Sequence, residues 1–188
     1  MSIDNIKTIS VRALVFAGTA VFSLAIMNSL PRVKEQRQRS FVRATMDGNL
    51  GRVRWLHFAG ARINGRSNLG NPLFLAASEG KLDVVRYLLD EGANPNARES
   101  SGSTPLAEAA YYGYVDVIKE LLLRGADINA IGEPGTALDI ALNRKNAAAA
   151  DLIRHYGGKT AREIAVVETR IDFIANNREA KRVGQNSF

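Results

Sequence analysis

The chain has 188 residues, enough for one domain with appended segments, and 46% of them are apolar, which allows a sizeable core. It contains no cysteine, and this excludes disulfides, thiolate metal sites and cysteine nucleophiles. The net charge of +6 is uneven, because basic residues crowd the first third and the middle is slightly acidic. An evenly basic nucleic-acid binder would look different.

The N-terminal region contains an uncharged apolar stretch. Residues 1–12 are a short polar start, and the run ALVFAGTAVFSLAIMNSL then occupies most of 13–31. As a helix this run would span about 27 Å, just enough for a thin bilayer. It is interpreted as a permanent membrane anchor, as a cleaved secretory signal with Ser23-x-Ala25 as the cleavage site, or as a buried core helix.

The charges around this stretch favour the anchor. Five Lys or Arg residues fall at 32–43 and only two precede the run, which places the downstream domain in the cytoplasm. The alternative is a periplasmic or secreted protein. Residues 32–39 are expected to form a basic juxtamembrane linker, more as a solvated flank than as a lipid-recognition site. A third alternative is an anionic-surface or nucleic-acid binder that uses the basic N-terminal third.

A two-helix pattern recurs in the middle of the chain. The segment NPLFLAASEGKLDVVRYLLDEGANPNA at 71–97 returns as TPLAEAAYYGYVDVIKELLLRGADINA at 104–130, with Pro72 and Pro105 33 residues apart. This period is typical of solenoids, whose repeats cannot bury their apolar faces alone. We expect four repeats at about 40–70, 71–103, 104–134 and 135–160.

The repeated motif resembles the ankyrin repeat, from the TPL-type helix start through the paired alanines to G-A-D/N-x-N. The resemblance covers roughly 40–160. It implies an all-α solenoid of about four helix-turn-helix repeats behind the N-terminal apolar helix. It also implies a protein–protein interaction module, here tethered to a membrane, and does not name the partner.

Local signals position the helices within each repeat. Asn71 and Thr104 are suited to cap helices that begin with proline. The apolar stripes of the second helices should form the core; they consist of Val84, Val85, Leu88, Leu89, Val117, Ile118, Leu121 and Leu122. Thr160 and Glu163 form a capping-box pattern. The helix they open, at 161–175, is expected to cap the open end of the stack, and 176–188 is a basic tail.

No catalytic signal emerges from the sequence. The two histidines, His57 and His155, lie in different repeats, and no zinc-like spacing, phosphate loop or nucleophile motif occurs. We therefore predict no enzyme activity, no cofactor, no metal and no small-molecule substrate. The expected partners are another protein and, through 13–31, a membrane, whereas nucleic acid is a less favoured partner.

Candidate contact residues follow from the resemblance, because ankyrin-like stacks bind with their turn tips and the late part of each first helix. The matching positions are Asn68, Leu69, Ser78, Glu79, Ser100, Ser101, Ser103, Tyr111, Tyr112, Asn143 and Arg144, with Met46 and Asp47 in the first repeat. Tyr111, Tyr112 and Tyr114 surround Gly113, and they are interpreted equally as binding anchors or as packing residues. Arg52, Arg54, Arg62 and Arg66 are expected to form a solvated face.

Overall fold

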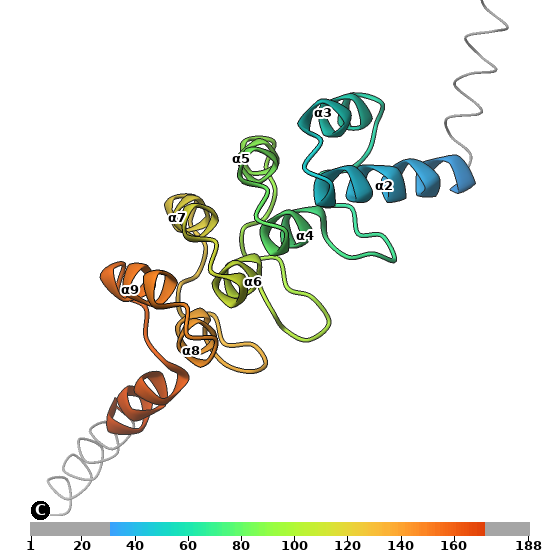
Figure 1. The fold of residues 1–188 in the computed structure, drawn as a ribbon. Helices are drawn as coiled ribbons and strands as arrows, with labels where there is room; N and C mark the ends of the chain where they lie inside the picture. The colour runs from blue at the N-terminus through green and yellow to red at the C-terminus, as the bar shows by residue number, and fades with distance from the viewer. Residues whose placement is uncertain (1–30, 172–188) are drawn as a thin grey trace, which may run out of the picture.

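Residues 31–171, described here in a computed structural model, form a stack of helix pairs in two rows (Figure 1). The inner row consists of α2 (Pro31–Met46), α4 (Pro72–Ser78), α6 (Pro105–Tyr112) and α8 (Ala137–Asn143). The outer row consists of α3 (Leu50–Phe58), α5 (Leu82–Asp90), α7 (Val115–Leu123) and α9 (Ala147–His155). Longer turns project beyond the inner row, and a further helix covers 161–171. The predicted all-α solenoid is confirmed.

The inner helices begin where the sequence provides caps. The Asn71 side chain accepts hydrogen bonds from two backbone N–H groups of α4, at 2.9 and 3.3 Å. Thr104 accepts one from α6 at 3.2 Å, and proline occupies the first position of both helices. α6 ends at Gly113, whose φ of 77° is left-handed and is adopted cheaply only by glycine. Short-range chemistry therefore fixes these helix boundaries.

Small and large apolar residues have different roles in the stack. The paired alanines of the inner helices, such as Ala76 and Ala109, are fully buried. Because they add little bulk, neighbouring inner helices pack more closely than neighbouring outer helices do. The larger side chains fill the space between the rows, where Leu88 and Leu106 are 0% and 1% exposed. Each such leucine stabilises the fold by about 1.5–3 kcal/mol through burial.

Three asparagines at matching positions link successive repeats, and we call Asn64, Asn96 and Asn129 the asparagine ladder. Asn64 and Asn96 each donate to the carbonyl of the glycine that follows the next outer helix, at 3.0 and 3.1 Å. All three accept a backbone N–H from the next repeat, at 3.0, 2.7 and 2.8 Å. These side chains thus satisfy backbone groups across each inter-repeat boundary.

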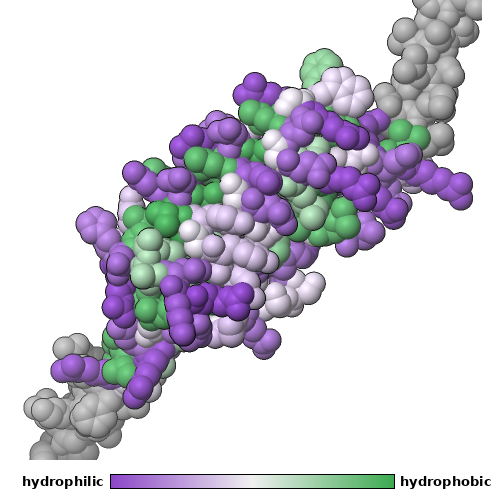
Figure 2. Space-filling view, viewed as in Figure 1, coloured by the Kyte–Doolittle hydropathy of each residue, from purple (hydrophilic) through white to green (hydrophobic). Residues whose placement is uncertain are grey.

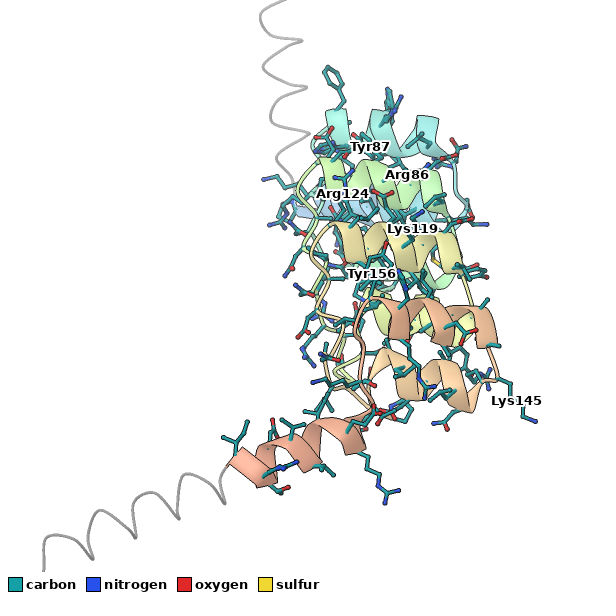
Figure 3. All side chains as sticks on the ribbon, turned by 90° about the vertical axis from the view of Figure 1, so that its left-hand side faces the viewer. Arg86, Tyr87, Lys119, Arg124, Lys145 and Tyr156 are labelled. Atoms are coloured by element: carbon teal, nitrogen blue, oxygen red, sulfur yellow. The ribbon has the colours of Figure 1, made fainter. Side chains whose placement is uncertain are left out.

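Ion pairs cross the exposed side of the outer row. Arg86 on α5 contacts Glu120 on α7 at 3.1 Å, and Arg124 contacts both Asp90 and Glu120, at 2.6 and 3.1 Å. Figure 3 shows Arg86, Lys119 and Arg124 on this one face. Solvated pairs of this kind contribute little stability, about 0–1 kcal/mol each. They do make the middle of the outer row a charge-paired surface.

The first repeat begins earlier than the sequence indicates. α2 runs without a break through 32–39, which we expected to be a separate linker. The reason is Gln38, which is 8% exposed and reaches the turn that follows α3. Its amide donates to the carbonyls of Arg62 and Gly65, at 3.0 and 2.7 Å, and accepts from the Arg62 N–H at 2.9 Å. A residue near the end of the expected linker thus belongs to the folded unit.

The helix at 161–171 does not pack over the end of the stack as expected. Its capping box is present, since the Thr160 N–H donates to Glu163 at 2.7 Å and the Glu163 N–H donates to the Thr160 hydroxyl at 3.2 Å. However, Val167 and Ile171 are 44% and 59% exposed. The helix instead extends away from α8 and α9 (Figure 1) and borders the turn that contains Ile131.

The predicted membrane segment at 13–31 lies outside the described residues, except for Pro31. Within 31–171, no helix combines the length and the apolar character needed to cross a bilayer.

Candidate functional site

The predicted contact residues fall into two groups at opposite ends of the inner helices. Asn68, Leu69, Ser100 and Ser101 are exposed in the turns that precede α4 and α6. Ser103 also precedes α6, and the remaining positions lie where the inner helices end. Inner helices of 7 or 8 residues are about 10 Å long, so a helix length separates the two groups. The turn tips and the helix ends are therefore distinct surfaces.

The helix ends carry a cluster of aromatic side chains around Gly113. The rings of Tyr111 and Tyr112 meet edge to face with centroids 4.9 Å apart. The rings of Tyr112 and Tyr114 stack at 5.8 Å and an interplanar angle of 25°. Both geometries are those that aromatic pairs prefer, which fixes the three rings relative to one another. A preorganised aromatic group loses little conformational entropy on binding.

Arg144 joins this cluster from the next repeat. Its guanidinium carbon lies 3.8 Å from the centre of the Tyr111 ring, so residues 33 positions apart in the chain form one site. The attraction between a guanidinium and an exposed ring is worth about 0.5–1 kcal/mol. Lys145 follows directly and stands clear of the stack in Figure 3. The repeat geometry thus places a rigid positive charge beside the tyrosines.

The structure assigns different roles to the three tyrosines. Tyr114 is half-buried and its ring covers Gly80, where an added Cβ would lie only 2.8 Å from it. Tyr111 is half-buried beneath Arg144, and its backbone carbonyl accepts from Asn146 at 2.8 Å. Tyr112 is 52% exposed. The packing interpretation therefore applies to Tyr114, whereas Tyr112 is free to touch a partner.

Four exposed residues at the ends of successive inner helices form what we call the helix-end row: Asp47, Glu79, Tyr112 and Arg144. Their order along the stack is acidic, acidic, aromatic and basic. Because each occupies the matching position of its repeat, the charges change sign along one line of the surface. Such a line can distinguish the two directions in which a peptide could cross it.

Other predicted residues are less accessible. Ser103 is 6% exposed and its hydroxyl donates to Glu108 at 3.0 Å, so its side chain belongs to the interior. The Ser78 hydroxyl donates to the carbonyl of Leu75 at 2.9 Å within α4. Met46 is half-buried, whereas Asn143 is exposed at the end of α8. Ser103 is therefore not supported as a contact residue.

The sequence missed one exposed pair. Trp55 occupies a position that is leucine-like in the repeat pattern, but it is 65% exposed, and Phe58 is 91% exposed. α3 is the first helix of the outer row (Figure 1), and both side chains lie on its outward side, whereas Val53 and Leu56 face the core. The available signal was the repeat register, because Asp90 and Leu123, which match Phe58 in the interior repeats, are exposed as well.

The fold and these surfaces define a helical-repeat binding module. Residues 41–131 match the family model described as ankyrin repeats (3 copies), so this part of the chain consists of ankyrin repeats. The chain is 40% identical over 63 residues to protein phosphatase 1 regulatory subunit 27 of Homo sapiens, and the Mus musculus protein of that name matches equally. It is 37% identical over 68 residues to the 2-5A-dependent ribonuclease of Mus musculus.

These matches cover only part of each protein. They involve 33% and 35% of this chain, and the chain spans 41% of the phosphatase subunit and 9% of the ribonuclease. The similarity therefore lies in the repeats. A protein-interaction module follows from the ankyrin repeats themselves.

Proposed function

We propose that the stack binds an extended segment of another protein along the helix-end row, with Tyr112 as the central contact. The observation that supports this most directly is the Arg144 guanidinium 3.8 Å above the Tyr111 ring, next to a Tyr112 that is 52% exposed. A fixed cation and a half-exposed ring offer an apolar contact and a charge in one place. Tyrosine and arginine are the residue types that most often dominate interface energies.

The row also defines the chemistry of the partner. A segment with basic side chains over Asp47 and Glu79, an apolar side chain over Tyr112 and an acidic side chain over Arg144 would match every charge. The reversed segment would place like charges together at both ends, which is costly. We therefore expect one binding direction.

A peptide-display experiment tests this proposal before any partner is known. The full-length chain, held in detergent micelles, is panned against a random peptide library. Enriched peptides should carry an apolar residue with basic residues on one side and acidic residues on the other. Tyr112→Ala should weaken their binding by at least about 5–30-fold, which corresponds to 1–2 kcal/mol. Its melting temperature should change little because the side chain is not in the core.

Tyr156 provides a matched control. It is 40% exposed, but it lies after α9 in the outer row, away from the helix-end row. Tyr156→Ala should leave peptide binding unchanged. Equal binding by the Tyr112 and Tyr156 variants, or enrichment of peptides without the expected charge order, would contradict the proposal.

We also propose that residues 13–31 tether the module to a membrane as a single-pass anchor with the repeats in the cytoplasm. The support is the uncharged run and the excess of basic residues after it. Full-length protein should remain in the membrane pellet through a carbonate wash with an intact N-terminus by mass. The repeats should be protected from protease in spheroplasts. A soluble product that begins near Ile26 would instead establish the exported form.

A further inference from the structure

We infer that the first repeat lies against the headgroups of an anionic bilayer, through a surface that we call the α3 corner. It consists of Pro31, Lys34, Trp55, Phe58 and Arg62. This inference rests on the proposed membrane tether and adds a second point of membrane contact to it. Three features of the described residues support it: exposed aromatic side chains, a turn after α3 that shares a cavity with the first half of α2, and the local charge.

The aromatic side chains project from the outward side of α3. Trp55 and Phe58 lie three residues apart, hence on one face of the helix, and they are 65% and 91% exposed. Val53 and Leu56, on the opposite face, are 0% and 5% exposed and belong to the core. Figure 2 shows hydrophobic atoms standing clear of the stack at this end. Tryptophan and phenylalanine favour the boundary between headgroups and acyl chains.

These aromatics lie where the chain would leave a membrane. α2 and α3 pack against each other, and the turn that follows α3 contacts Gln38 in the first half of α2. Pro31 and Lys34 line one cavity of about 580 Å³ together with Gly60 and Arg62, and Gly60 is only two residues beyond Phe58. The predicted membrane run ends immediately before Pro31. An anchored chain would therefore bring Phe58 close to the bilayer surface.

The charge of the α3 corner selects an anionic surface. The cavity is lined by Lys34, Arg37, Arg62 and Arg66, against the single carboxylate of Glu35. Glu35 is paired with Arg39 at 2.5 Å and Arg66 is paired with Glu99, so Lys34 and Arg62 provide the positive charge of this surface. Phosphate and serine headgroups would complement this excess of positive charge. Two copies of the chain meeting through the same corner would instead bring like charges together.

Such contact would have a mechanical consequence. A tether at Pro31 alone lets the stack pivot about one point. Insertion of Trp55 and Phe58 into the headgroup region adds a second point, which fixes the orientation of the stack and therefore of the helix-end row relative to the membrane.

Trp55 is the single tryptophan of the chain and reports its own environment. Full-length protein is reconstituted into phosphatidylcholine vesicles with and without phosphatidylserine, and in parallel with brominated acyl chains. In vesicles that contain phosphatidylserine, Trp55 emission should shift to the blue and brominated lipid should quench it. Acrylamide should quench Trp55 at least several-fold less well there than in vesicles without phosphatidylserine. High salt should weaken these effects because the attraction is electrostatic.

Phe58→Ser removes one of the two aromatic contacts without touching the core and should reduce quenching by brominated lipid several-fold. Leu123→Ser is the matched control, because Leu123 is 62% exposed on α7, in a different repeat of the outer row, and should leave quenching unchanged. Equal effects of the two variants would overturn the inference.

The remaining outcomes separate this inference from the proposed functions. If the protein floats with the vesicles while Trp55 stays open to acrylamide and unquenched by lipid, the tether stands and the docking fails. If Trp55 becomes shielded only as protein concentration rises, without lipid quenching, a second copy covers it and the inference is wrong. If the protein does not float with anionic vesicles at all, both tether and docking fail, whereas peptide binding at Tyr112 is unaffected.

Discussion

Asn96 provides the sharpest test of how the repeats are coupled. Its side chain makes two hydrogen bonds across the boundary between the second and third repeats: it donates to the carbonyl of Gly125 at 3.1 Å and accepts from the N–H of Asp127 at 2.7 Å. Asn96→Ala removes both. A net contribution of about 0.5–1.5 kcal/mol per bond gives a total of about 1–3 kcal/mol.

The lower part of that range applies here, because Asn96 is exposed and water can reach the backbone groups that lose their partners. We therefore expect Asn96→Ala to lower the free energy of unfolding by about 1–2 kcal/mol and the melting temperature by about 3–8 °C. Urea denaturation followed by circular dichroism gives the first value. Hydrogen exchange measured by mass spectrometry should show that the loss is concentrated at the boundary between the two repeats.

Asn94 is the control for residue type and location. Its side chain accepts from the Asn96 N–H at 2.9 Å, so this bond remains within one turn. Asn94→Ala should cost less and should leave the coupling between repeats unchanged. If the Asn96 variant is as stable as the Asn94 variant, the asparagine ladder does not couple the repeats and the reasoning is refuted.

Three further changes probe other parts of the structure. Leu88→Ala should lower the free energy of unfolding by about 2–5 kcal/mol in urea titrations, because the side chain is fully buried. Gly80→Ala should lower the melting temperature, because the φ of Gly80 is 64° and the new Cβ would lie 2.8 Å from the Tyr114 ring. Adding Tyr114→Ala to this variant should recover part of the lost melting temperature, because it removes the close contact. The backbone N–H of Thr160 lowers the pKa of Glu163 below its ordinary value of 4.5. The Glu163 carboxylate therefore stabilises the 161–171 helix fully above about pH 4.5, and this stabilisation is lost as the pH falls through the lowered pKa. Hydrogen exchange should show this acid-dependent loss of protection in the unchanged protein and not in Glu163→Gln.

Much of the fold could be predicted because its signals are local. Thr104 and Pro105 start a helix wherever they occur in this order, and Gly113 ends it because glycine alone adopts the left-handed conformation cheaply. The capping pair Thr160 and Glu163 behaves in the same way. A spacing of 33 residues then places equivalent side chains in register along the stack. The boundaries of the helices from α4 to α9 and the core stripes of the second and third repeats follow from these short-range rules, whereas the start of α2 does not.

Contacts between repeats depend on tertiary structure, because they join residues about 30 positions apart whose distance no local rule sets. Arg144 lies over Tyr111 only because α6 packs against α8. Gln38 finds hydrogen-bond partners only in the turn after α3, and α2 accordingly begins as early as Pro31. The exposure of Phe58, by contrast, agrees with the repeat register, since the matching residues Asp90 and Leu123 of the interior repeats are exposed as well. The sequence by itself determined the repeating unit, whereas the tertiary structure decided which side chains of that unit meet each other and which meet solvent.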